Sequence, residues 1–90
     1  MVHASAAQSR QHLVVVVAAD CGGCGRAREV AEEVVRRLPT AVVDVIDVEV
    51  GELPEGLPFL GTPTYFYNDR LISMGNPEPD HLVTLLAGAR

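Results

Sequence analysis

The apolar residues change their spacing along the chain, and each change predicts an element. Residues 12–18 form a continuous run rich in β-branched side chains, which is typical of a strand buried on both faces. From Arg26 onward apolar residues recur at helical spacing and form one stripe: Ala27, Val30, Ala31, Val34 and Leu38. This stripe predicts an amphipathic helix that packs on one side, and Pro39 ends it.

The second half of the chain reads as short strands and loops. Residues 41–50 predict a strand, but Asp44 and Asp47 interrupt it. At most one of these carboxylates could be a buried acid near the functional site, and an edge strand is the simpler interpretation. The Gly- and Pro-rich residues 51–61 predict a loop.

The last part of the chain predicts a hairpin followed by a helix. Residues 64–67 and 70–74 predict strands of a hairpin around a two-residue turn, Asn68-Asp69. The last helix is expected to open with Asn76 as its N-cap and Pro77 at its first position.

This order of elements predicts an α/β fold. The first two strands flank a helix, so they should be parallel through a right-handed crossover, whereas the last two form an antiparallel hairpin. We expect a mixed four-stranded sheet packed by two main helices. A chain of 90 residues makes one domain. We assign residues 1–11 to a flexible tail and residues 12–90 to the domain.

Composition narrows the classes of partner. The sequence is 48% hydrophobic and 21% charged, which suits a globular protein. Its formal net charge of −5 repels phosphate backbones and anionic headgroups, so we expect neither nucleic acid nor membrane as a partner.

No run approaches the ~20 apolar residues of a membrane span, and we read the protein as cytoplasmic. Two cysteines three positions apart then indicate redox or metal chemistry.

The two cysteines lie between the first strand and the first helix. The free N–H groups and the positive dipole end of that helix favour a thiolate on Cys21. Cys24, one turn further on, can attack a mixed disulfide formed on Cys21. Asp20 is a candidate for tuning this thiol, because a neighbouring negative charge raises a thiol pKa. Alternatively, Asp20 merely ends the strand.

A second motif makes the pattern specific. The sequence Gly61-Thr62-Pro63-Thr64 stands directly before a predicted strand. Together with the Cys-Gly-Gly-Cys motif and the order of elements, it resembles the thioredoxin/glutaredoxin superfamily over residues 12–87. The resemblance implies that Pro63 is cis and lies against the cysteines, that the Thr62 backbone pairs with substrate, and that Gly75 lies near the substrate groove.

The sequence departs from both branches of that superfamily. Thioredoxins usually place Trp before the first cysteine, Gly-Pro between the cysteines and a buried Asp in the first strand. Here the first two places hold Asp20 and Gly22-Gly23, and residues 13–17 contain no acid. Glutaredoxins usually carry Pro-Tyr between the cysteines and a Gly-Gly turn before the last helix, where this chain has Gly75-Asn76. The subclass therefore stays open.

The function predicted is thiol–disulfide exchange on protein disulfides. Cys21 attacks, Cys24 resolves, and Thr62 and Pro63 position the substrate. A reductase or glutathione supplies electrons, no cofactor is expected, and the role would be electron transport in cell redox homeostasis. One alternative is a glutathione-dependent, glutaredoxin-like reductase.

A second alternative is a non-enzymatic module that binds a metal or an iron–sulfur cluster. A lone Cys-x-x-Cys is only half a closed zinc site. The three histidines, His3, His12 and His81, lack ligand spacing. We therefore predict no metal site.

Overall fold

The computed structural model describes residues 11–88. The predicted tail, apart from Gln11, lies outside the described residues, as do residues 89–90. The elements are β1 (His12–Val17), α2 (Cys24–Arg37), β2 (Val42–Asp47), β3 (Thr64–Tyr67), β4 (Arg70–Met74) and α3 (Pro79–Gly88). Neither of these helices is long and apolar enough to cross a membrane.

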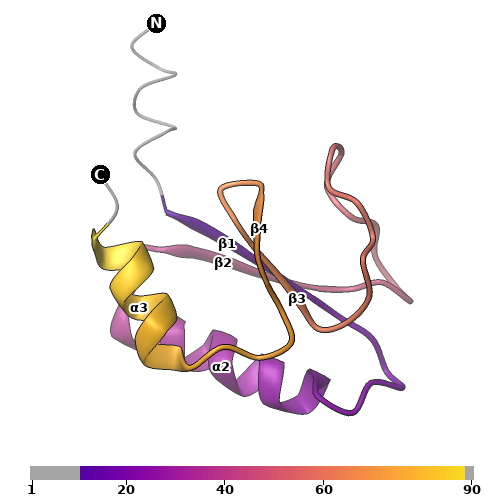
Figure 1. Cartoon of the computed structure of the whole chain (residues 1–90), viewed down its shortest axis with the longest axis horizontal. Coiled ribbons are helices and arrows are strands. Elements are labelled where there is room, and N and C mark those ends of the chain that lie inside the picture. The colour runs from indigo at the N-terminus through magenta and orange to yellow at the C-terminus, as the bar shows by residue number, and fades with distance from the viewer. Residues whose placement is uncertain (1–10, 89–90) are drawn as a thin grey trace, which may run out of the picture.

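One mixed sheet organises the fold, with strand order β2-β1-β3-β4 (Figure 1). β1 pairs parallel with β2 and antiparallel with β3, and β3 pairs antiparallel with β4. This arrangement confirms the predicted four-stranded sheet, with one parallel pair and a hairpin. It places β1 in the interior, so the strand that leads into the cysteines is paired on both edges.

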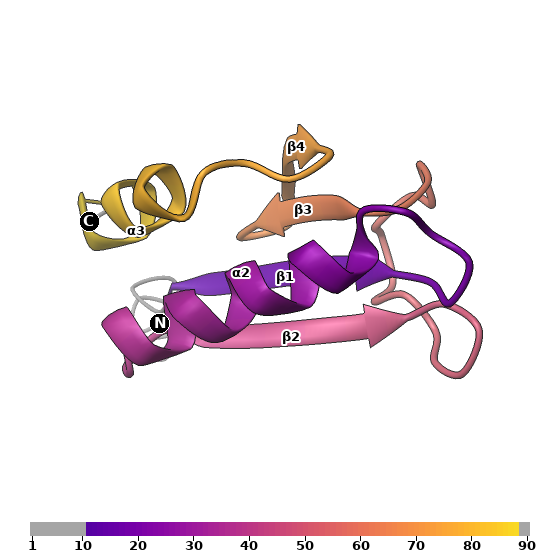
Figure 2. The ribbon, with the colours of Figure 1, turned by 90° about the horizontal axis from the view of Figure 1, so that it is seen from below.

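The two faces of β1 are covered differently. Leu13, Val15 and Val17 belong to one core cluster with buried residues of α2 and α3. Figure 2 shows α2 running across β1 and β2, with α3 to one side of it. Val14 and Val16 point to the opposite face, where the long segment between β2 and β3 contributes Leu53 and Leu57. Because both faces are covered, every position from 13 to 17 is buried, which explains the continuous apolar run.

β2 is an edge strand, as its interrupting carboxylates predicted, but it ends at Asp47 and not at Val50. The chain turns at Asp47, whose backbone carbonyl accepts hydrogen bonds from the N–H groups of Val50 (3.0 Å) and Gly51 (2.8 Å). The Asp47 carboxylate also accepts from the Glu49 N–H at 2.9 Å. An Asp that bonds backbone two residues on favours a turn over a strand.

The β3–β4 hairpin has the predicted bounds and the predicted two-residue turn. Asn68 (φ 48°) and Asp69 (φ 70°) both adopt left-handed backbone, which a turn compatible with the strand twist requires. The Asn68 side chain also accepts a hydrogen bond from the His12 N–H at 3.0 Å. This contact ties the turn to the start of β1.

The start of the last helix differs from the prediction. α3 begins at Pro79, so Asn76 is not its N-cap and Pro77 is not its first residue. A residue that precedes proline is driven away from helical backbone, so Glu78 cannot continue a helix into Pro79. The Asn76 side chain is instead engaged elsewhere, next to the cysteines.

Candidate redox site

The cysteine pair lies where β1 passes into α2. Cys24 is the first residue of α2, two positions earlier than the apolar period had predicted the helix to start. Cys21 and Cys24 form a disulfide with a Cα–Cα distance of 5.4 Å. The Cys24 N–H donates to the Cys21 carbonyl at 3.2 Å, so the motif forms a tight turn onto the helix.

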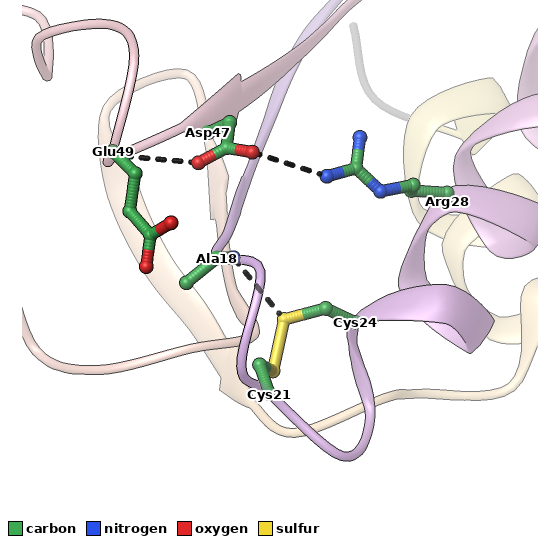
Figure 3. Close-up of polar contacts among 6 residues, drawn as sticks. All are labelled: Ala18, Cys21, Cys24, Arg28, Asp47 and Glu49. Carbon is green, nitrogen blue, oxygen red and sulfur yellow. Dashed lines mark hydrogen bonds and ion pairs between the residues drawn. A yellow bond between two sulfur atoms is a disulfide. The ribbon is translucent and has the colours of Figure 1, made fainter.

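The two sulfurs have different surroundings. Cys24 is 2% exposed and packs in the core, and its Sγ accepts a hydrogen bond from the Ala18 N–H at 3.4 Å (Figure 3). Cys21 is half-buried at the edge of the same core. A reaction partner that approaches from solvent therefore meets the Cys21 sulfur first.

The end of α2 provides a positive field at this point. Its N-cap residue, Gly23, has no side chain to bond the free N–H groups, and the first turn contains no acidic residue. Arg26 lies in that turn, where its guanidinium pairs with the Glu29 carboxylate at 3.3 Å. These features favour a thiolate on Cys21 once the disulfide is reduced. Asp20 is exposed in the preceding turn, and its effect on Cys21 stays a prediction.

The Thr62–Pro63 bond is cis, which confirms the conformation that the resemblance implied. Two hydrogen bonds hold this turn. The Thr64 hydroxyl donates to the Gly61 carbonyl at 2.7 Å, and the Gly75 N–H donates to the Pro63 carbonyl at 2.8 Å. The turn is thereby fixed to both β3 and the residue after β4.

The structure brings Pro63 against the cysteine motif. A Cβ atom placed on Gly23 would lie 3.5 Å from the Pro63 Cδ, so the ring is in van der Waals reach of the motif. Gly75 adopts φ 103°, a left-handed conformation that favours glycine. Because the Gly75 N–H bonds the Pro63 carbonyl, Gly75 lies next to the same proline that contacts the cysteine motif.

Asn76 completes the site, and sequence reasoning missed it. Its Nδ2 donates to the Gly23 carbonyl at 2.9 Å, and its Oδ1 accepts from the Tyr65 hydroxyl at 2.7 Å. Tyr65 is fully buried in β3. Because Asn76 and Gly23 are 53 positions apart, no local pattern signals their contact.

A second polar group lies beside the motif. Arg28 of α2 pairs with Asp47 at 3.4 Å, at the end of β2 (Figure 3). Since the other Asp47 oxygen accepts from the Glu49 N–H, both carboxylate oxygens have partners. Asp44 lies three residues earlier in β2, and its carboxylate bonds the His12 ring at 2.8 Å. Neither aspartate is a buried, unpaired acid.

Within residues 11–88, no group of three or more His, Cys, Asp or Glu side chains is arranged to hold a metal ion.

Comparisons with known proteins identify the fold. No protein-family model matches the sequence, and no curated protein matches it. Among solved structures, the chain is similar to the germline-specific thioredoxin Deadhead of Drosophila melanogaster. The match has a TM-score of 0.65 and 23% identity, and it covers 94% of this chain and 86% of that one. The likeness, together with the sheet topology and the Cys21–Cys24 disulfide, makes this chain a thioredoxin-like protein in its fold.

Proposed function

We propose that this protein is a thiol–disulfide oxidoreductase that reduces disulfides of other proteins through Cys21 and Cys24. The observation that supports this function best is the unequal pair at the helix end. One sulfur is reachable at an uncapped N-terminus, and the other is buried within its reach. A structural disulfide needs neither the uncapped helix end nor the accessible sulfur.

The exchange takes two balanced steps. The Cys21 thiolate attacks one sulfur of the substrate disulfide, forms a mixed disulfide and expels one substrate thiolate. Cys24 then loses its proton and attacks the Cys21 sulfur, which re-forms the Cys21–Cys24 disulfide and expels the second substrate thiolate. Two electrons have moved to the substrate, and its two expelled thiolates become thiols by taking up protons from solvent, which has received those released by Cys21 and Cys24. The Ala18 N–H, which bonds the Cys24 Sγ, stabilises negative charge on the resolving sulfur.

Thr62, Pro63 and Gly75 form the substrate side of the proposed site. In the described chain, the main-chain N–H and C=O of Thr62 take part in no hydrogen bond. An extended substrate segment could pair with these groups as an added strand does at a sheet edge. The space next to Gly75 is open, because apart from its two chain neighbours no atom lies within 4 Å of where its Cβ would be.

A reductase or glutathione returns the electrons, and we place this cycle in the cytoplasm, where thiol systems keep such pairs reducible. The test is reduction of insulin by the purified protein, followed by turbidity. One assay contains NADPH with thioredoxin reductase, and the other contains NADPH, glutathione and glutathione reductase. We expect catalysis above the background in at least one assay, and none from Cys21→Ser.

Failure in both assays would contradict the proposed activity. A metal analysis and a visible spectrum of the same preparation test the alternative that the protein is a non-enzymatic module that binds a metal or an iron–sulfur cluster. Stoichiometric zinc or iron lost in Cys21→Ser would support a binding module on this fold.

A further inference from the structure

The contacts of Asn76 connect the buried core to the loop between the cysteines. The Tyr65 hydroxyl, the Asn76 amide and the Gly23 carbonyl form a chain of two hydrogen bonds, of 2.7 and 2.9 Å. A carbonyl can only accept, so the group of Asn76 that faces Gly23 must be its NH₂. The opposite amide orientation would set two oxygens against each other.

Tyr65 fixes this orientation from the other end. Burial raises the pKa of Tyr65 to about 12, so its hydroxyl keeps its proton throughout the range in which thiols ionise. With that proton it donates to the Asn76 Oδ1 and leaves the amide NH₂ for Gly23. The Asn76 amide therefore has one orientation in which both of its hydrogen bonds form, and it keeps that orientation over the pH range in which thiols ionise.

The loop that Asn76 holds has little rigidity of its own. Gly22 and Gly23 separate the cysteines, and glycine backbone has more conformational freedom than any other. The Gly23 carbonyl already accepts the first helical hydrogen bond from the Ala27 N–H at 3.0 Å. The bond from Asn76 adds a contact to the segment that follows β4, so the loop is held from outside the helix as well.

We propose that Asn76 is a positioning residue that holds the Cys-Gly-Gly-Cys loop in the geometry from which Cys21 and Cys24 close their disulfide, with Tyr65 orienting its amide. The inference rests on the proposed function, since it needs the pair to cycle between dithiol and disulfide. Asn76 and Tyr65 would thus restrain the loop backbone, which Gly22 and Gly23 leave flexible.

This role has a measurable consequence for the redox equilibrium. In the exchange with glutathione, the protein dithiol and one glutathione disulfide give the protein disulfide and two glutathione thiols. Two electrons and two protons pass from the protein to glutathione. A restrained loop loses less conformational entropy on closing, which favours the protein disulfide. Removing the restraint should therefore make the disulfide easier to reduce.

The test compares equilibrium constants in glutathione buffers, read by alkylation and mass spectrometry of the intact protein. Asn76→Ala should lower the constant for disulfide formation about two- to tenfold, the range of one hydrogen bond. Tyr65→Phe, which keeps the amide but loses its orienting donor, should shift the constant in the same direction by less.

Tyr67→Phe is the matched control. Tyr67 lies two residues along β3, its ring is in the same core, and its hydroxyl bonds the Gln11 side chain at the far end of the strand from the cysteines. It should lower the free energy of unfolding of the oxidised and reduced forms equally and leave the constant unchanged.

The outcomes separate positioning from ordinary stability. An Asn76→Ala variant that destabilises both redox forms equally and leaves the constant unchanged would overturn the proposal, and so would a variant with a larger constant. If that variant does not fold, Tyr65→Phe and Tyr67→Phe decide, and an equal constant for the two overturns it. A wild-type protein that forms no reversible disulfide would refute the proposed function, whereas a reversible wild type with insensitive variants would refute only the role of Asn76.

Discussion

The two glycines between the cysteines should respond differently to alanine. A Cβ on Gly22 would meet no atom within 4 Å, whereas a Cβ on Gly23 would lie 3.2 Å from the Asn76 Nδ2 and 3.5 Å from the Pro63 Cδ. Neither glycine has left-handed backbone, and Gly23 has φ −101°, so alanine is sterically allowed by the backbone at both positions. The difference between the variants then reports the crowding at position 23 and the poorer fit of alanine at the N-cap of α2, and both lower the stability of Gly23→Ala.

The magnitude follows from two terms. Alanine reduces the conformational entropy of the unfolded chain and stabilises by about 0.4–1 kcal/mol at either position. At position 23 the Asn76 amide must also retreat, although it is held by two hydrogen bonds. This retreat weakens the bond to Gly23, and its complete loss would cost about 0.5–1.5 kcal/mol. Since the entropy term is common to both, Gly23→Ala should be less stable than Gly22→Ala by up to about 1.5 kcal/mol.

The assay is urea unfolding of the oxidised proteins, followed by circular dichroism and analysed at a common slope. Gly22→Ala should equal or exceed the wild type in free energy of unfolding. Equal stability of the two variants, or a more stable Gly23→Ala, would refute the argument. It would mean that the Asn76 side chain moves aside at no measurable cost and that position 23 is not crowded.

Three further predictions concern single groups at the site. Brief alkylation of the reduced protein should label Cys21 before Cys24, because Cys24 is 2% exposed, and peptide mapping that finds the reverse order would exchange their roles. Thr64→Val should lower the free energy of unfolding by about 0.5–1.5 kcal/mol in urea titrations, since it removes the bond to the Gly61 carbonyl. The raised pKa of Tyr65 means that the folded state keeps a proton which the unfolded state loses near its ordinary value of 10.0, so stability should fall as pH rises from 10.0 to about 12. Tyr65→Phe should flatten that fall, and an unchanged slope in the variant would show that Tyr65 is not its source.

The sequence allowed much of the framework to be predicted, because its local patterns agree with the tertiary contacts. The apolar run at residues 12–18 is continuous because β1 is covered on both faces. The helical stripe predicted which side of α2 packs inward, and all four of its members within the helix are buried: Ala27, Val30, Ala31 and Val34. The hairpin was predicted to the residue, since its turn is local.

The error that matters most for the site lies where a distant contact decides the structure. Asn76 precedes a proline-rich helix start and therefore reads as an N-cap, but its side chain bonds Gly23, 53 positions away. The sequence predicted that Tyr65 lies in the core, and it does, but its hydroxyl also donates a hydrogen bond to Asn76 at the site. The Cys21–Cys24 pair and Pro63 were predicted from motifs. Asn76 could not be, because only the folded chain brings the end of β4 to the start of α2.

Trapping of the reaction intermediate tests thiol–disulfide exchange itself. Reduced Cys24→Ser and Cys21→Ser proteins are mixed with excess insulin, quenched with acid and examined by non-reducing electrophoresis and mass spectrometry. Because Cys21 is the accessible sulfur and Cys24 the resolving one, Cys24→Ser should accumulate a mixed disulfide through Cys21, and the adduct should disappear on addition of dithiothreitol. Cys21→Ser should form none. An adduct on Cys24 alone, or on neither variant, would contradict the proposed exchange.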